Sequence, residues 1–172
     1  KEDLEDTTDL AKKAVDLLDY NDELSLQDVE CLILITQNPD SNGLPHSSAI
    51  LHRKLNLSFK CSVFDISLGC SGYVHGLSIA KSFMEGNGFS NGILVTADPY
   101  SKIVDPKDRD TAMLFGDGSS ATWLSNNYPV WDIGPFDFGI DSAHNDALSV
   151  RENGCLFMNG RAVFIFAATQ VP

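Results

Sequence analysis

The stretch that decides the fold is Phe64–Gly76, which reads FDISLGCSGYVHG. Its first residues are typical of a buried strand, and its central glycines allow a sharp turn around Cys70. From residue 71 to residue 84, apolar side chains recur at steps of three and four, which predicts a helix. Gly86 and Gly88 are expected to end that helix. Cys70 is therefore expected beside a helix N-terminus.

This position suits a nucleophilic thiol. The free amides and the dipole of a helix N-terminus stabilise negative charge, and so favour a thiolate. The pattern is the thiol counterpart of the serine elbow of hydrolases, with Gly69 and Gly72 permitting close approach of the backbone. The alternative interpretation makes Cys70 a small buried hydrophobic residue, the commonest role of a free cysteine. The local pattern leaves both interpretations open.

The composition narrows the class of protein. The chain has 172 residues, of which 43% are hydrophobic and 21% charged, the profile of one soluble globular domain. Acidic residues outnumber basic residues by 24 to 12, and they are dense in residues 1–30, as on a solvated helix face. The net charge of −12 argues against binding to nucleic acid or to an anionic membrane, both of which require basic patches. No apolar run approaches membrane-spanning length.

The four cysteines argue against a metal or redox motif. No pair has CxxC spacing, which disfavours a zinc site or a thioredoxin-like motif, and no metal is expected. Two disulfides are possible in principle. However, two of the cysteines lie in or beside apolar strand-like runs, and we identify no signal peptide. Reduced thiols in a cytoplasmic protein are therefore expected. The cysteines are Cys31, Cys61, Cys70 and Cys155.

Helical and strand-like segments alternate, which is typical of an α/β layered domain. The first helix is expected to bury Leu10, Ala14, Leu17 and Leu18. The strand over 29–36 contains a continuous apolar run, which predicts burial on both faces of a parallel sheet. The predicted helices span 3–20, 46–55 and 71–84, and the strands span 29–36, 62–67, 93–97, 113–115 and 120–124, with a short strand within 127–153 and a helix from 160.

The glycine-rich sequence Gly116-Asp117-Gly118 is not predicted to bind phosphate. A phosphate loop leads into a helix and usually carries a lysine. Here the motif leads into the strand-like residues 121–124. A structural turn is the better interpretation.

Three segments in this order and spacing point to one family. They are Asp65–Gly72 followed by GLSIA, Asp105–Thr111 followed by LFGDG, and Met158–Phe164. The chain resembles β-ketoacyl-acyl carrier protein synthase III, of the thiolase superfamily, over nearly its whole length. The resemblance implies a thiolase-like layered α/β fold, with a mixed sheet covered by helices. It also implies that residues 1–126 form an N-terminal half without its first strand, and that residues 127–172 form a connection and the start of a truncated C-terminal half.

The resemblance implies an acyltransferase of fatty-acid biosynthesis initiation. Cys70 matches the nucleophile that takes an acyl group from acyl-CoA. That group is then condensed with malonyl-acyl carrier protein by decarboxylative Claisen condensation. The Cys70 amide matches one half of the oxyanion hole. Acyl-CoA is a substrate, and no permanently bound cofactor is expected. The family forms a homodimer, and we expect the strand over 93–97 to pair across its interface.

The resemblance also implies roles for residues of the CoA and acyl sites. Arg109 matches the arginine that contacts the nucleotide end of CoA and helps to dock the carrier protein. Its local alternative is a surface arginine that neutralises neighbouring aspartates. Gly160 matches a backbone position that lines the pantetheine channel. Phe115, with Tyr100 close by, matches a wall of the acyl pocket, and Leu44 matches a loop residue that closes the pocket of the partner subunit.

Plain alternatives exist for these apolar side chains too, namely an ordinary core phenylalanine and a plain loop leucine. If the large side chains do fill the pocket, short acyl groups are the expected substrates.

The family completes its catalytic triad with a histidine and an asparagine from its C-terminal half, and no pair in this chain matches them. The histidines are His46, His52, His75 and His144. His75 is expected to be a helix-face or core residue. The chain alone is therefore predicted to be inactive. Two alternatives remain: a related acyltransferase that does not decarboxylate malonyl groups, and a non-enzymatic module for dimerisation or carrier-protein binding.

Overall fold

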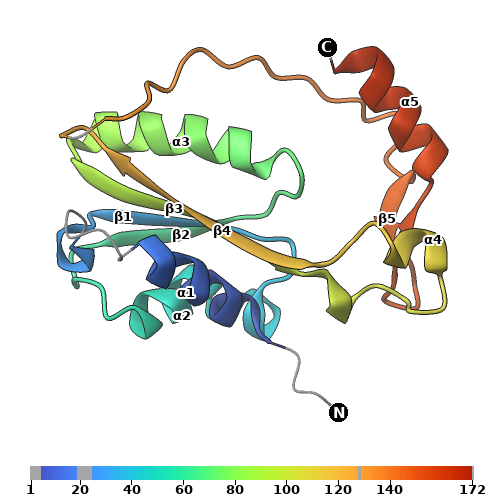
Figure 1. The fold of residues 1–172 in the computed structure, drawn as a ribbon, viewed down its shortest axis with the longest axis horizontal. Helices are drawn as coiled ribbons and strands as arrows, with labels where there is room; N and C mark the ends of the chain where they lie inside the picture. The colour runs from blue at the N-terminus through green and yellow to red at the C-terminus, as the bar shows by residue number, and fades with distance from the viewer. Residues whose placement is uncertain (1–4, 19–24, 128, 172) are drawn as a thin grey trace. The chain divides into compact units, whose positions relative to one another are not determined.

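The first part of the molecule is a four-stranded mixed sheet with helices on both faces (Figure 1). The computed structural model describes residues 5–18, 25–127 and 129–171. The strand order is β2-β1-β3-β4; the first three strands are parallel and β4 is antiparallel to β3. The mixed α/β sheet is as predicted. The strands are β1 (Cys31–Ile35), β2 (Ser62–Ile66), β3 (Asn91–Pro99) and β4 (Asp117–Ser125).

Strand β1 forms the centre of the core. All five of its residues are buried, and it is hydrogen-bonded in parallel to β2 on one edge and to β3 on the other. Its side chains alternate between two apolar clusters, one on each face of the sheet. An uninterrupted apolar run is what such a strand requires, since neither face meets water. The prediction for residues 29–36 is confirmed.

Helices α1 (Thr7–Leu18) and α2 (Ser47–Lys54) cover one face of the sheet. Helix α2 agrees with the predicted segment 46–55. The predicted apolar face of α1 is confirmed for Leu10 and Leu18, which are partly buried against the core. It is wrong for Leu17, which is 71% exposed, whereas Ala11 and Val15 are fully buried. The cause is Asp40, whose carboxylate accepts hydrogen bonds from the amides of Thr7 and Thr8 at the start of α1. These bonds fix the rotation of the helix about its own axis. Positions 3–4 and 19–20 of the predicted helix lie outside the described residues.

Helix α3 (Gly72–Asn87) covers the opposite face (Figure 1). Its buried positions are spaced by four residues and are small near its start: Gly72, Gly76, Ala80 and Met84. The helix ends as expected at Gly88, which takes a left-handed conformation with φ 68°. Gly86, in contrast, lies within the last turn of the helix.

The predicted role of segment 93–97 as a strand that pairs across a dimer interface is wrong. Strand β3 is bonded to β1 on one edge, and to β4 along its whole length on the other, from Asn91 opposite Ser125 to Pro99 opposite Asp117. Its apolar centre is therefore covered within the chain. The edges of the described sheet are β2 and β4.

The chain folds into two compact units. The first contains the residues up to 99 together with residues 117–136. The second contains residues 100–116 and those from 137 on. The predicted helix from residue 160 and the short strand within 127–153 are confirmed by α5 and β5. The strand predicted over 113–115 is wrong, because residues 113–114 continue the turn that closes α4 and β4 begins only at Asp117. The elements of the second unit are α4 (Arg109–Ala112), β5 (Leu148–Val150), β6 (Leu156–Met158) and α5 (Gly160–Gln170).

The described residues also form short 3-10 helices, namely η1 (Leu26–Asp28), η2 (Asp40–Gly43) and η3 (Tyr100–Lys102). The predicted boundary between family halves at residue 126 stays a prediction. Among the helices described, none has both the length and the apolar character needed to cross a membrane.

Candidate functional site

Cys70 lies in the turn between β2 and α3, as the sequence predicts. The turn is closed by a hydrogen bond of 2.7 Å from the Gly72 amide to the Gly69 carbonyl. The Cys70 side chain is exposed, so its interpretation as a small buried hydrophobic residue is wrong. Because β1, β2 and β3 are parallel, this turn lies at the carboxyl end of the sheet.

Close packing, rather than an unusual backbone conformation, explains the glycines of this elbow. Neither Gly69 nor Gly72 is among the described glycines with positive φ. A Cβ atom on Gly72 would lie 2.5 Å from Cγ2 of Ile35, closer than real Cβ atoms approach another atom. A Cβ atom on Gly76 would also overlap Ile35, and would lie 3.0 Å from Cδ1 of Leu94. The N-terminal half of α3 can rest directly on the sheet because these positions carry no side chain.

The start of α3 lacks the side-chain cap that other helices have. Asp108 caps α4 and Asn159 caps α5, whereas the Ser71 side chain bonds no α3 amide. Within the described part of the chain, the amides of Cys70, Tyr73 and Val74 donate no hydrogen bond. Helix N-termini with free amides attract negative charge. The elbow therefore offers N–H donors next to an exposed thiol.

Asp98, which sequence reasoning missed, organises the same end of the sheet. One oxygen of its carboxylate accepts hydrogen bonds from the Thr36 hydroxyl (3.0 Å), the Gln37 amide (2.8 Å), and the Asn38 amide (3.2 Å) and side chain (2.9 Å). It thereby ties the end of β3 to the end of β1. An acid directly after the apolar run ILVTA is the signal that could have identified it.

Leu44 lies in the loop that leaves this same end of the sheet after β1. Its side chain is 85% exposed, so its own unit gives it no core position. The loop ends at α2, whose first amides, those of Ser47 and Ser48, each donate a 2.7 Å hydrogen bond to Asp65 of β2. The loop is thus anchored to the strand that leads to Cys70. The assignment of Leu44 to an acyl pocket stays a prediction.

In the second unit, the structure brings together the two aromatic residues predicted for the acyl pocket. The rings of Tyr100 and Phe115 have centroids 5.0 Å apart. Arg109 begins α4 and is exposed. Among the described residues it makes no ion pair with its aspartate neighbours. Asp108 instead accepts hydrogen bonds from Thr111, which hold the pKa of Asp108 below its ordinary value.

Gly160, the first residue of α5, is exposed. A Cβ atom there would meet only Cε of Met158, at an ordinary 3.6 Å, so packing within the unit does not require glycine. His75 bonds the Ser71 carbonyl of its own helix through Nδ1, as expected of a helix-face residue. No cluster of three or more potential metal-ligating side chains occurs in the ranges that the structure covers.

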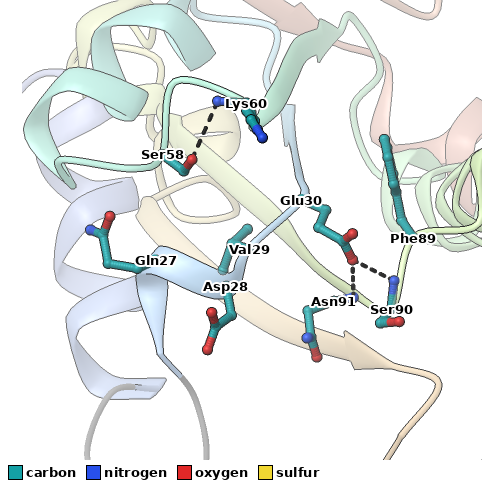
Figure 2. A pocket seen from close by; sticks show the side chains of 9 residues that line it. All are labelled: Gln27, Asp28, Val29, Glu30, Ser58, Lys60, Phe89, Ser90 and Asn91. Carbon is teal, nitrogen blue, oxygen red and sulfur yellow. Dashed lines mark hydrogen bonds between the residues drawn. The ribbon is translucent and has the colours of Figure 1, made fainter.

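The amino end of the sheet carries a hollow of about 530 Å³ (Figure 2). Cys70 follows the carboxyl end of β2, at the opposite end of the strands. The lining of the hollow comes from the segments that lead into β1, β2 and β3. Glu30 organises it by accepting hydrogen bonds from the Ser90 amide (2.5 Å) and the Asn91 amide (3.1 Å). The lining is both polar and apolar, and its one carboxylate with a described partner, Glu30, is bonded to backbone amides, so we assign no catalytic group to it. The residues are Gln27, Asp28, Val29, Glu30, Ser58, Lys60, Phe89, Ser90 and Asn91.

The thiols of Cys31 and Cys61 also lie at this amino end, and both are buried. Burial raises the pKa of Cys31 to about 12 and that of Cys61 to about 11, because an apolar environment disfavours the thiolate. All four cysteines are free. The exposed thiol is therefore at one end of the sheet and the protected thiols at the other.

Comparison with known proteins agrees with the resemblance found in the sequence. The family model of 3-oxoacyl-[acyl-carrier-protein (ACP)] synthase III matches residues 64–142. The β-ketoacyl-[acyl-carrier-protein] synthase III of Bacillus pumilus is 32% identical over 94% of this chain and 50% of its own length. That of Clostridioides difficile is 36% identical over 87% of this chain and 45% of its own length.

Solved structures agree as well. A crystal structure of 3-oxoacyl-(acyl-carrier-protein) synthase III matches with a TM-score of 0.90 and 34% identity, over 99% of this chain and 58% of that one. The Aquifex aeolicus enzyme matches with a TM-score of 0.84 and 30% identity, over 96% of this chain and 52% of that one. The predicted thiolase-like fold is confirmed. The chain spans about half the length of the relatives it matches.

Proposed function

Because this chain belongs to the 3-oxoacyl-[acyl-carrier-protein] synthase III family over the half of that family's length that it spans, we propose that the whole protein is an acyltransferase that initiates fatty-acid biosynthesis. The Cys70 thiolate attacks the thioester carbonyl of acyl-CoA, and the bond to the CoA sulfur breaks. Malonyl-acyl carrier protein then loses carbon dioxide. The resulting enolate carbon attacks the Cys70 thioester, forming a carbon–carbon bond and releasing the thiolate.

The observation that carries this proposal is the exposed thiol of Cys70 beside free amides. The attack on a thioester places negative charge on its carbonyl oxygen. Preorganised N–H donors stabilise such an oxyanion without reorganisation at the moment of reaction. The amides of Cys70, Tyr73 and Val74 are unpaired among the described residues, and they are the donors that this chain can offer.

The second unit supplies residues suited to the substrate. The Arg109 guanidinium is exposed and unpaired among the described residues, as binding to the nucleotide phosphates of CoA requires. Gly160, which packing does not require, would let the pantetheine arm run close to the backbone. The paired rings of Tyr100 and Phe115 are proposed to wall an acyl pocket, and Leu44 to reach the pocket of a partner subunit. Short acyl groups are the proposed substrates.

We propose a homodimer that pairs through β2 instead of β3. Strand β2 has one strand neighbour in the described sheet, and its apolar residues Val63, Phe64 and Ile66 are half-buried. An apolar sheet edge favours pairing with another strand. Strand β4, at the opposite edge, is polar and largely exposed over its first half. A cytoplasmic location is also proposed, and the four free thiols support it.

The condensation step requires groups beyond those identified in this chain. The histidine and asparagine of the family have no match among its residues, so the 172 residues alone are proposed to lack condensing activity. The experiment should therefore use the longest polypeptide that contains them.

To test the proposal, that polypeptide is incubated with acetyl-CoA or octanoyl-CoA, and the intact mass and the Cys70 peptide mass are recorded. We expect one acyl adduct on Cys70, formed faster from acetyl-CoA. Cys70→Ser should lower its rate by about a thousandfold or more, as loss of a catalytic nucleophile does. Cys155→Ser is the control that should leave it unchanged.

Absence of any adduct on the folded protein would contradict the first half-reaction. An adduct without carbon dioxide release from malonyl-acyl carrier protein would identify instead an acyltransferase that does not decarboxylate. Full biological function with Cys70→Ala would identify a non-enzymatic module.

A further inference from the structure

Residues 35–37, at and just after the end of β1, contact the Cys70 elbow or the strand end that leads into it. Ile35 fills the space left by the side-chain-free positions 72 and 76 of α3. The Thr36 amide donates to the carbonyl of Ile66, the last residue of β2, at 3.1 Å. The Gln37 side chain packs against the glycine that precedes Cys70. The elbow is therefore built against the end of β1.

The position of that end is in turn fixed by Asp98. Its carboxylate oxygen receives four donors from residues 36–38. The Thr36 side chain is 2% exposed, so its hydroxyl has little access to water as a replacement partner. The strand pairing of β1 ends at Ile35, and beyond it only the Thr36 amide bonds the backbone of a neighbouring strand among the described contacts. Asp98 is thus the anchor of the segment that contacts the elbow.

We propose that Asp98 is a positioning residue for Cys70, which acts through Thr36 and Gln37 on the turn between β2 and α3. The kinetic part of this inference rests on the proposed function, and the structural part does not. Reacting groups must be held closely, since a displacement of about 1 Å can lower a rate about a hundredfold. Loss of the carboxylate leaves the three residues without their common acceptor, and so loosens the surface against which the elbow is held.

Glu30 provides a matched control at the other end of the same strands. Its carboxylate also ties β1 to β3, by accepting two amides of the β3 start. Figure 2 shows this contact, which involves no residue of the elbow. Asp98→Ala and Glu30→Ala therefore remove the same kind of link between the same two strands. Of the two variants, only Asp98→Ala removes a link that supports the elbow around Cys70.

The first measurement is hydrogen exchange on the full-length protein, which requires no enzymatic activity. The amides of Leu68 and Gly72 are bonded across the elbow, to Ile66 and to Gly69. We expect Asp98→Ala to speed their exchange about tenfold or more, with less change at the Leu55 amide, which bonds Leu51 in the distant α2. Glu30→Ala should leave Leu68 and Gly72 within about twofold of their original rates.

The second measurement is single-turnover acylation by acetyl-CoA. Asp98→Ala should lower the rate constant at saturation by about tenfold or more, with an unchanged half-saturating concentration. Asp98→Asn keeps an acceptor oxygen, and should restore most of that rate. If Asp98 only stabilised the fold, Asp98→Ala would lower the fraction of protein that is active. The molecules that remain folded would then be acylated at the original rate.

Equal exchange at the elbow in the Asp98→Ala and Glu30→Ala proteins would overturn the proposal. If Asp98→Ala does not fold, Thr36→Val replaces it, because it removes the hydroxyl link and keeps the shape. Unchanged exchange at Leu68 and Gly72 in Thr36→Val would then overturn the proposal. An acylation failure in the original protein would contradict the proposed function alone, since the exchange measurement stands apart from it.

Discussion

The two ends of the sheet are built alike but present different groups to the solvent. At each end a carboxylate ties β1 to β3 through backbone amides, Glu30 at the amino end and Asp98 at the carboxyl end. The amino end has a hollow of about 530 Å³ but buries its two thiols, whereas the carboxyl end exposes Cys70. The exposed thiol and the unpaired amides therefore distinguish the two ends, and the volume of a hollow does not.

The largest expected difference between the ends is in thiol reactivity. In the native protein, iodoacetamide should alkylate Cys70 about a hundredfold or more faster than Cys31 or Cys61, because the buried thiols have raised pKa values and little access to the reagent. Peptide masses over time at about pH 8 measure the three rates. Unfolding in denaturant is the control, and should bring the rates together. Comparable rates in the native protein would remove the distinction between the two ends.

A smaller effect is expected from α3, in which two glycines differ in their surroundings. Gly76→Ala should destabilise the protein by about 1–3 kcal/mol, because the added methyl overlaps Ile35 and crowds Leu94 in a packed core. Gly86→Ala should instead stabilise it by about 0.5–1 kcal/mol, because that position has no neighbour within 4 Å and alanine favours helix. Urea unfolding measures both changes.

A double mutant sharpens this prediction. Ile35→Val shortens the side chain that Gly76→Ala would meet, so the two changes together should destabilise less than the sum of the single changes. Additive effects would mean that the glycine is not required by contact with Ile35.

The smallest expected effect is in the response to alkaline pH, and it concerns the amino end. The folded state raises the pKa of Cys61 from 9.0 to about 11, so its contribution to stability is complete below pH 9.0 and is lost as the pH rises toward 11. The loss from pH 9 to about 10 amounts to about 1 kcal/mol. The free energy of unfolding, measured in urea, should therefore fall more steeply with pH over this range in the original protein than in Cys61→Ala. Parallel slopes would contradict burial of this thiol in its neutral form.

The sequence predicted well those elements whose character is local. The apolar run of β1 defined the centre of the sheet, and the spacing of apolar residues after Cys70 defined α3. The elbow itself followed from two glycines in a strand-to-helix pattern. The elbow and α3 depend on neighbours within a few residues. Strand β1 depends on burial on both faces, which an apolar run indicates directly.

The errors came from contacts between residues far apart in the chain. Which face of α1 is buried depends on Asp40, more than thirty positions after Thr7. The covered edge of β3 depends on β4, which no local pattern assigns to it. The part played by Asp98 depends on its facing Thr36 across the sheet. Local propensity is a weak guide where such tertiary contacts decide.

The buried face of α3 has a further consequence for engineering. Side-chain volume along it increases with distance from Cys70, from hydrogen atoms at Gly72 and Gly76 to a methyl group at Ala80 and a thioether at Met84. The spacing between the helix backbone and the sheet is therefore set, at the end near Cys70, by the strand side chains of Ile35 and Leu94. Substituting position 72 by progressively larger residues should raise Cys70 above the sheet in graded steps, which makes the height of its thiol adjustable without altering the thiol.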